Sequence, residues 1–248
     1  MLYKIYEEET NIIYYLSIND IIKLIKNNID NTFYKYIENI KIKINNKIIK
    51  TEFICHRINT INELQNIDKE FGVEIDLRDE NDKIILSHDP FYKDESDNFE
   101  DYLKDYKNNT LILNIKSERI EIECLKLLDK YNVTNYFFLD SSFPMIYLLN
   151  KTYNNNKFAY RFSEYESLDN FIKNKEMYKY IWVDCFNNFP LNKENYKIIK
   201  ENNIKICIVS PELQKQFEKI KEYREIIIDN DIIPDMICCK YYNIIYWI

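Results

Sequence analysis

Residues 72–78 read Gly-Val-Glu-Ile-Asp-Leu-Arg, and this stretch decides the fold. Apolar and charged side chains alternate along it, which is the period of a β-strand whose two faces meet different surroundings. Glu74, Asp76 and Arg78 therefore share one face, and the apolar residues between them share the other. In a barrel of parallel strands the apolar face packs against the outer helices, which leaves the charged face for the interior.

The same rhythm continues on both sides of this stretch from residue 51 onward. Short β-branched and aromatic runs, typical of strands, alternate with charged amphipathic runs that are typical of helices. The predicted strands are Glu52–His56, Val73–Arg78, Thr110–Lys116, Tyr136–Asp140, Lys157–Ser163, Tyr180–Phe186, Lys205–Ser210 and Met236–Tyr242. The predicted helices include Ile61–Phe71, Phe99–Tyr106, Ile120–Tyr131, Ser167–Lys175, Lys193–Asn202 and Pro211–Asn230. Eight strands, each followed by a helix except the last, predict an α/β fold, a (βα)₈ TIM-type barrel over residues 51–248. An open doubly wound sheet is the alternative.

Two segments break this rhythm. The run Lys83–His88 follows the second strand across a polar turn, so we expect a hairpin arm on the barrel rim. Residues 1–50 form an N-terminal extension or cap. There the sequence predicts a strand at Ile12–Ser17, a helix at Ile18–Glu38 and a second strand at Ile40–Ile49.

The composition excludes several classes of function. With Gly72 as its one glycine, the chain cannot form a P-loop or a dinucleotide-binding loop, and we expect asparagine in left-handed turn positions. The 41 acidic and 34 basic residues are interspersed, which leaves no basic face for nucleic acid. We expect no signal peptide and no transmembrane segment, since no uncharged run approaches the ~20 residues that span a bilayer. Six cysteines without CxxC spacing indicate buried, reduced thiols in a cytoplasmic protein.

Reactive side chains gather at the C-terminal ends of the predicted strands, where barrels place their chemistry. His56 and Arg57 end the first strand, Asn114 and Lys116 end the third, and His88 ends the hairpin run. The later strands end near Asp140, Arg161, Glu164, Asp184, Ser210, Glu212 and Lys240. Because the only two histidines of the chain both lie at strand ends around a Glu-x-Asp pair, a functional role is favoured over a structural one.

These residue types suit the cleavage of a phosphodiester. The reaction needs a base for the attacking oxygen and an acid for the leaving oxygen, and histidine can take either role near neutral pH. Arginine and lysine neutralise phosphate oxygens, while two carboxylates on one strand face suit Mg²⁺ or Ca²⁺. A serine nucleophile elbow is absent, and two histidines 32 positions apart cannot form the metallohydrolase motif that places both on one strand.

The same motifs resemble the glycerophosphodiester phosphodiesterase group, within the superfamily of phosphatidylinositol-specific phospholipase C-like phosphodiesterases. That group has His-Arg after the first strand, a glycine and then Glu-x-Asp on the second, and His-Asp after a short following strand. The matching residues here are Cys55-His56-Arg57, Gly72-Val73-Glu74-Ile75-Asp76 and Ser87-His88-Asp89-Pro90. The run Leu113-Asn114-Ile115-Lys116-Ser117 is similar to short forms associated with surface-polysaccharide synthesis.

The resemblance implies a role for each residue of the candidate site. It implies that His56 and His88 are the catalytic acid and base, that Arg57 and Lys116 contact the substrate phosphate, and that Glu74, Asp76 and Asn114 bind a divalent cation. Asn114 stands where the group usually has glutamate, so metal affinity is expected to fall. The implied substrate is a small phosphodiester: a glycerophosphodiester, a phospho-glycan or a sugar-nucleotide.

Three functions remain open on the sequence alone. The first is a metal-assisted phosphodiester hydrolase, favoured because both histidines and both carboxylates are present. The second is a phospholipase C-like transferase that forms a cyclic phosphate. The third is a barrel that binds a phosphate or a glycan without turnover, which Asn114 favours.

Overall fold

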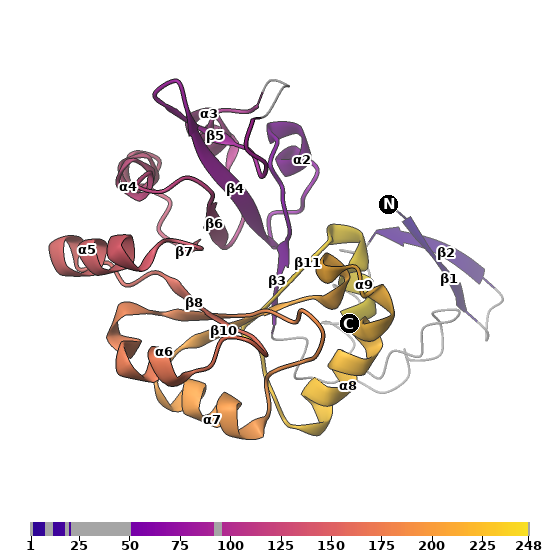
Figure 1. Ribbon diagram of the computed structural model, residues 1–248. Helices are drawn as coiled ribbons and strands as arrows, with labels where there is room; N and C mark the ends of the chain where they lie inside the picture. Colours follow the sequence, from indigo (N-terminus) through magenta and orange to yellow (C-terminus); the bar gives the residue numbers. More distant parts are fainter. Residues whose placement is uncertain (1, 8–11, 18–19, 21–50, 92–95, 248) are drawn as a thin grey trace.

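Eight short parallel strands form a sheet that curves almost into a closed ring (Figure 1). They are β3 Glu52–Cys55, β4 Gly72–Glu80, β6 Leu111–Ile115, β7 Tyr136–Leu139, β8 Ala159–Phe162, β9 Tyr180–Val183, β10 Lys205–Val209 and β11 Met236–Cys239. The strands follow this order around the ring, and β11 pairs with β3, which joins the last strand to the first. The predicted (βα)₈ barrel is thereby confirmed. The computed structural model describes residues 2–7, 12–17, 20, 51–91 and 96–247.

The ring is weakest between β7 and β8, a junction that we call the seam. A single parallel bridge, Phe138 with Phe158, is the pairing recorded there. The amide of Phe138 donates to the carbonyl of Lys157 at 2.9 Å, and the rings of Phe138 and Phe158 stack with centroids 5.5 Å apart. The seam is therefore held by side-chain packing more than by a ladder of backbone hydrogen bonds.

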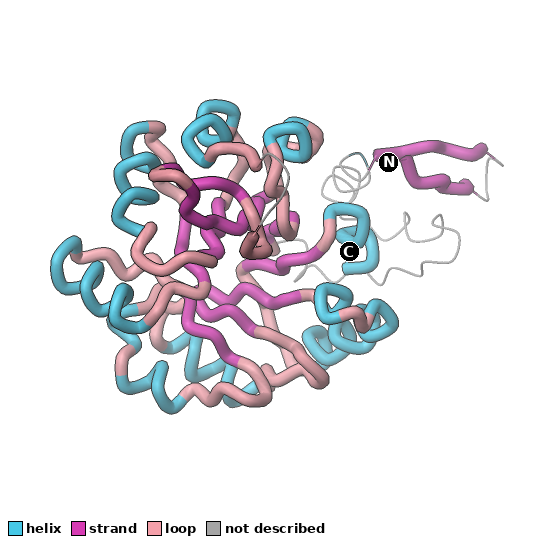
Figure 2. Tube along the Cα trace, turned by 45° about the horizontal axis from the view of Figure 1, so that its top comes forward, coloured by secondary structure: helices cyan, strands magenta, loops and turns pink. Residues whose placement is uncertain are grey.

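Helices follow the strands and surround the ring, as the view in Figure 2 shows. They are α2 Ile61–Gln65, α3 Phe99–Asp105, α4 Glu121–Lys130, α5 Phe143–Tyr153, α6 Asp169–Lys173, α7 Lys193–Glu201, α8 Ile220–Asp229 and α9 Ile244–Trp247. Single 3₁₀ turns accompany them at η3 Lys175–Met177, η4 Pro211–Gln214, η5 Phe217–Lys219 and η6 Tyr241–Asn243. Within the part of the chain that the structure describes, no helix has the length and hydropathy to cross a bilayer.

Buried apolar residues form two clusters, one on each side of the sheet. The inner cluster fills the barrel with side chains such as Ile54, Ile112, Trp182 and Cys238. The outer cluster packs strand residues such as Val73, Ile75 and Leu77 against buried helix residues such as Leu64 and Leu128. Because strand residues alternate between the clusters, a residue two positions beyond an inner apolar residue also points inward. This alternation positions the polar residues of the site.

Gly72 is needed for space, not for its backbone freedom, since it has no positive φ. A Cβ atom at this position would come within 2.7 Å of the Thr110 carbonyl oxygen and 2.8 Å of Glu52 Oε1, and it would overlap the side chain of Ile54. Glu52 reaches across Gly72 to accept hydrogen bonds from the backbone N–H and the hydroxyl of Thr110, at 2.9 and 2.8 Å. The glycine therefore permits a link between β3 and the start of β6.

Asparagine, as predicted, and also aspartate, which was not predicted, together occupy most of the left-handed backbone positions among the described residues. Among the described residues, eleven have positive φ without being glycine, and seven of these are Asn81, Asp82, Asn132, Asp140, Asn154, Asn203 and Asp231. Their short polar side chains tolerate this region better than most others. Arg57 is an exception with φ 54°, and it lies directly after His56.

Two hairpins accompany the barrel. β5 Lys83–Leu86 pairs antiparallel with the outer end of β4, which confirms the predicted arm. In the N-terminal region, β1 Leu2–Glu7 pairs antiparallel with β2 Ile12–Ser17, so the predicted strand at Ile12–Ser17 is present. The predicted helix at 18–38 and strand at 40–49 lie outside the described residues, apart from Asp20. The domain boundary near residue 50 stays a prediction.

The structure corrects the sequence prediction at the C-terminal end. The last strand stops at Cys239, not Tyr242, and a 3₁₀ turn and α9 follow where no helix was expected. Trp247 of α9 is fully buried, and its indole N–H donates to Ser210 Oγ at 2.8 Å. The predicted helix 211–230 is divided into η4, η5 and α8, and α5 occupies the expected helix position between the fourth and fifth strands, for which no bounds were predicted.

Candidate active site

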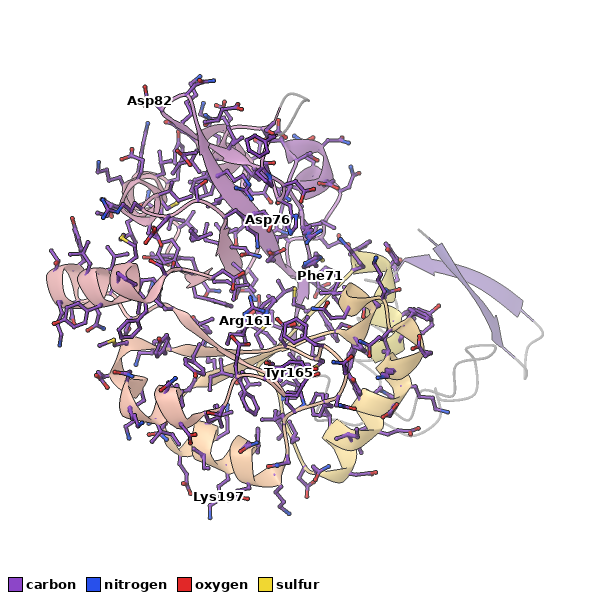
Figure 3. All side chains as sticks on the ribbon, in the orientation of Figure 1. Phe71, Asp76, Asp82, Arg161, Tyr165 and Lys197 are labelled. Atoms are coloured by element: carbon purple, nitrogen blue, oxygen red, sulfur yellow. The ribbon has the colours of Figure 1, made fainter. Side chains whose placement is uncertain are left out.

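The C-terminal ends of the strands surround a cavity of about 630 Å³. Its charged lining includes Arg57, Lys116, Asp140, Arg161, Asp184 and Lys240, together with the imidazole of His56. Most of these follow an inner apolar residue by two positions, as Lys240 follows Cys238 and Asp184 follows Trp182. Figure 3 shows Asp76 and Arg161 toward the centre of the ring, whereas Asp82 and Lys197 lie at its periphery. The strand period thus places a polar layer above the apolar interior.

Glu74 lies beneath the cavity and is fully buried. Its Oε2 accepts the backbone N–H of Arg57 at 2.8 Å, and its Oε1 accepts the side-chain amide of Asn114 at 2.8 Å. His56 Nε2 lies 3.8 Å from Oε2. The N–H of Arg57, a residue in the left-handed region, thereby ties the end of β3 to β4.

Asp76 is also fully buried, and Asn59 holds it at two points. The Asn59 side-chain amide donates to Asp76 Oδ2 at 2.9 Å, and its carbonyl oxygen accepts the Asp76 backbone N–H at 2.9 Å. Burial, followed by the neighbouring charge of Glu74, raises the pKa of Asp76 above its usual value. The Asn59 hydrogen bond and the charge of Lys116, whose Nζ lies 3.6 Å from Oδ1, act against this rise in pKa. Arg57 Nε lies 3.7 Å from Oδ2.

His56 is a mostly buried imidazole, with 14 % of its side chain exposed. Burial is the main cause that lowers the pKa of His56, to about 3, and the positive charges of Lys240 and Arg57 act in the same direction. The ring is therefore neutral at neutral pH. Its Nδ1 is buried and has no hydrogen-bond partner among the described residues. A neutral imidazole at the cavity wall is able to accept a proton.

His88 is held by one partner at each nitrogen. Nδ1 lies 2.7 Å from Asp89 Oδ1, and Nε2 lies 2.5 Å from a terminal nitrogen of Arg57. Because arginine only donates and an ionised carboxylate only accepts, we assign the hydrogen to Nδ1 and an acceptor role to Nε2. Arg78 fixes the backbone through two hydrogen bonds to the His88 carbonyl, at 2.9 and 3.2 Å.

The structure places His88 beside the cavity, not in its wall. His56 and Arg57 line the cavity and His88 does not. The Arg57 guanidinium links the two histidine positions, since it bonds to His88 and follows His56 directly in the chain. The predicted residues thus come together on one rim, but Arg57 occupies Nε2 of His88.

Lys116 belongs to a chain of alternating charges across the cavity. Its Nζ lies 3.5 Å from Asp140 Oδ2. Asp140 also pairs with Arg161, and Arg161 pairs with Asp184. Although burial opposes the charged form, Asp140 and Asp184 raise the pKa of Arg161. This chain runs from β6 to β9 and so crosses the seam.

The oxygens beneath the cavity suit a hard divalent cation. Asp76 Oδ1 and Asn114 Oδ1 are both buried and lack a hydrogen-bond partner among the described residues. Buried polar atoms without partners are uncommon because each costs free energy, and they are often explained by an ion or a water. Carboxylate and amide oxygens are what Mg²⁺ and Ca²⁺ prefer. The donor set is small, since no group of three His, Cys, Asp or Glu side chains in the described ranges is placed to hold a metal.

The sequence prediction left out several residues of this arrangement. Asn59, which holds Asp76, is not among the predicted site residues. Asp140, Arg161, Asp184 and Lys240 were noted at strand ends without a role. A sequence signal for these four residues was available, because each lies at the C-terminal end of a predicted strand, where barrels place their chemistry.

Comparison with solved structures identifies proteins that share this fold. No protein-family model matches the sequence, and no curated protein does. Among solved structures, a glycerophosphoryl diester phosphodiesterase from Parabacteroides distasonis matches with a TM-score of 0.53 and 16 % identity, over 75 % of this chain and 81 % of that one. A glycerophosphodiester phosphodiesterase from Agrobacterium tumefaciens matches with a TM-score of 0.53 and 13 % identity, over 76 % and 96 %.

A third similar structure carries a ligand. It is an Oleispira antarctica phosphodiesterase in complex with its product sn-glycerol-3-phosphate, with a TM-score of 0.54 and 14 % identity over 75 % of this chain and 92 % of that one. All three are phosphodiesterases, and the agreement covers most of each chain. This protein therefore has the barrel fold of the glycerophosphodiester phosphodiesterases.

Proposed function

We propose that this protein is a phosphodiester hydrolase of the glycerophosphodiesterase type. The observation that carries the proposal is the rim around Glu74 and Asp76, where two histidines, Arg57 and Lys116 meet two buried carboxylates. The fold shared with known phosphodiesterases supports the same reaction class. These residues supply a base, an acid, phosphate contacts and cation ligands within one cavity rim.

His56 is suited to be the general base. Its ring lines the cavity and is unprotonated, which places it to take a proton from a water molecule whose oxygen attacks phosphorus. The lowered pKa makes the ring a weaker base than a free histidine, so its role as base rests on its position. The new bond joins this oxygen to phosphorus, and the ester bond to the departing alcohol breaks. The alcohol oxygen then needs a proton.

His88 is suited to supply that proton. Asp89 accepts the hydrogen on Nδ1 and orients the ring, as a carboxylate does in other acid–base pairs of this kind. Because Nε2 accepts from Arg57 and carries no hydrogen in this arrangement, Arg57 must move away before Nε2 can take up a proton from solvent and deliver it to the leaving oxygen. A phosphate in the cavity provides the reason, because it offers the guanidinium a better, charged acceptor than an imidazole nitrogen.

A divalent cation, Mg²⁺ or Ca²⁺, completes the proposal. Glu74, Asp76 and Asn114 would hold it, supported by the unpartnered oxygens of Asp76 and Asn114. When bound, such an ion polarises the phosphoryl oxygens and stabilises charge in the transition state. Asn59 keeps Asp76 oriented for this role through its two hydrogen bonds.

The substrate proposed is a small phosphodiester: a glycerophosphodiester, a phospho-glycan or a sugar-nucleotide. The cavity wall after β10 and β11 includes Phe217, Tyr242 and Tyr246. Phe217 and Tyr246 meet edge to face with centroids 4.9 Å apart, and both rings are partly exposed. Aromatic rings beside polar groups suit a sugar, which supports the two glycan-bearing classes over a plain glycerol ester. The buried thiols agree with the predicted cytoplasmic location.

A phosphate- or glycan-binding barrel without turnover is the second candidate. Two observations favour it: Asn114 supplies no charge to the cation, and Arg57 occupies Nε2 of His88. A binding protein would retain the cavity and the cationic contacts, but it would not need the histidines.

The deciding experiment is a cleavage assay. Purified protein is incubated with bis(p-nitrophenyl) phosphate and with glycerophosphodiesters, with and without Mg²⁺ or Ca²⁺. The H56A and H88A proteins serve as comparisons, and circular dichroism checks that they are folded. We expect cation-dependent release that either substitution abolishes. Phosphorus NMR of the product separates hydrolysis from formation of a cyclic phosphate.

Each contrary outcome has a definite meaning. Full activity in either histidine variant would remove the acid–base assignment. Absence of cleavage in a protein that binds inorganic phosphate would instead favour the binding barrel.

A further inference from the structure

Lys240 is a cation of the cavity that the proposed reaction does not use. It follows β11 directly, and β11 is the neighbour of β3, which carries His56. Lys240 lines the cavity together with His56, Arg57 and Lys116. It approaches His56 from the side opposite to Lys116, because β4 and β6 lie on the other flank of β3.

The charge of Lys240 is not matched by a carboxylate. Its Nζ donates to the backbone carbonyl of His56 at 3.2 Å, and its backbone N–H donates to Glu212 Oε1 at 3.1 Å. In the described part of the chain, the other cations that line the cavity each pair with carboxylates: Arg57 with Asp76, Lys116 with Asp76 and Asp140, and Arg161 with Asp140 and Asp184. No ion pair of Lys240 is found among the same residues.

An ammonium in this position is suited to bind an anion. Lysine has three donors, and a single carbonyl uses one of them. A partly buried cation without a counter-ion is costly, whereas a charged acceptor in the cavity would offset that cost. The positive charge of Lys240 also contributes, after burial, to the lowered pKa of His56.

We propose that Lys240 is an additional phosphate-binding residue, which contacts the substrate phosphate from the flank of His56 opposite to Lys116. The inference rests on the proposed function. The phosphate would then be contacted by Lys240 on one flank of His56 and by Lys116 on the other. Arg57, the residue after His56, would be the third cation of the site. The contact to the His56 carbonyl keeps the ammonium at that edge of the cavity.

The alternative is a purely structural lysine that ties β11 to β3. The chain offers a matched control for it. Lys157 is also partly buried, and its Nζ also donates to a backbone carbonyl, that of Thr134, at 2.6 Å. It precedes β8 at the opposite end of the barrel and does not line the cavity. Its removal changes the net charge by the same amount.

The test is calorimetric titration of the full-length protein with inorganic phosphate. The variants are K240M, K240R, K157M and K116M, and thermal unfolding is recorded for each. We expect K240M to weaken phosphate binding by roughly ten- to a hundredfold, the range for hydrogen bonds to charged groups. K240R should stay within about threefold of the wild type, since it keeps the charge, and K157M should bind normally.

The outcomes separate this inference from the proposed function. Unchanged phosphate affinity in K240M, with a lowered melting temperature, would make Lys240 structural and overturn the inference. If K116M then still weakens binding, the proposed function stands without Lys240. Absence of phosphate binding by the wild-type protein would overturn both.

Discussion

The two histidines of the site are held in different ways, and this difference suggests separate roles. His56 lies in the cavity wall with a buried, unpartnered Nδ1 and a pKa lowered to about 3, mainly by burial. His88 lies outside the wall, with Asp89 at one nitrogen and Arg57 at the other. A neutral base and an acid that is released when Arg57 moves would follow from these environments alone.

Asn114 is a neutral ligand of the proposed cation site, so replacing it with a carboxylate tests that site. We expect N114D to bind Mg²⁺ or Ca²⁺ more tightly, by roughly tenfold, because a third carboxylate joins Glu74 and Asp76. Without a cation, the new carboxylate would face Glu74 Oε1, which now accepts the Asn114 amide at 2.8 Å. The melting temperature should therefore fall in chelator and recover with the cation.

Calorimetric titration and thermal unfolding measure both effects. E74Q is the companion variant, and it should weaken cation binding. Equal cation affinity in N114D, E74Q and the wild type would remove these oxygens from the metal site.

Gly72 is expected to resist replacement by any residue with a Cβ atom. We expect G72A to lower the free energy of unfolding by about 2 kcal/mol, since the methyl group would overlap Ile54 and approach the Thr110 carbonyl. Urea unfolding measures the change. I54V removes the methyl group nearest to the new atom, so it should cost less in the G72A background than in the wild type. Simple additivity of the two substitutions would contradict the steric explanation.

The sequence indicated most of the candidate site at the level of residues. The period of two in β4 placed Glu74 and Asp76 inward, and the structure buries both. Their proposed roles, like those of the histidines, stay predictions. The position of Arg57 between His88 and the cavity was not predictable, because it depends on a left-handed residue at φ 54°, a conformation that arginine rarely adopts.

At the scale of elements, the carboxylate of Glu52 connects β3, β4 and β6 at the N-terminal end of the barrel. Glu52 of β3 bonds to Thr110, just before β6, across Gly72 of β4. Burial is the main cause that raises the pKa of Glu52, although the Thr110 hydrogen bonds oppose it. The same feature that links the strands therefore makes the fold sensitive to pH.

The sign of that sensitivity can be tested with E52Q. Because the folded state holds the Glu52 proton more tightly than the unfolded chain, this group stabilises the fold at low pH and loses that contribution as pH rises through its folded pKa. Glutamine cannot ionise, and its amide can still reach Thr110. We expect E52Q to raise the free energy of unfolding at pH 7 and to change it much less near pH 4. Urea unfolding at both pH values measures this, and a loss of stability at pH 7 would show that the ionised form is favoured.

The strands were easier to predict than the helices. Each strand is a short β-branched or aromatic run, and the observed ends differ from the predicted ones by a few residues. No bounds were predicted for α5 because its exposed face carries Phe143, Tyr147 and Leu148, which hides the amphipathic pattern. The predicted helix at 61–71 ends at Gln65, where Asn66 caps it and a turn follows. Tertiary packing decided these boundaries.

At the scale of the whole molecule, the backbone pairing between neighbouring strands differs around the ring. Seven junctions are strand ladders, whereas the seam has one backbone bridge, a ring stack and the ion pair of Asp140 with Arg161. Sequence patterns predict strands and their order, but not how tightly two neighbouring strands pair. The closure of the ring was therefore predictable from strand number, and its weak point was not.

R161M tests whether the charge chain holds the seam closed. We expect faster amide hydrogen exchange in β7 and β8, by roughly tenfold, because the substitution removes the ion pairs to Asp140 and Asp184. Amides of β10 and β11 should exchange as in the wild type. Mass spectrometry of peptides from each strand measures the difference, and a uniform increase across all strands would indicate a general loss of stability.

All six cysteines of the chain are free thiols buried in the protein. Burial raises the pKa of each thiol, so reactive thiolate is scarce as well as inaccessible in the folded state. An alkylating reagent can then modify a cysteine only while the surrounding structure is open. Cys124 lies on the buried face of α4, in the outer cluster, and Cys207 and Cys238 lie inside the barrel. The natural protein thus carries built-in kinetic reporters that would time the opening of its outer layer and its interior separately, without an introduced label.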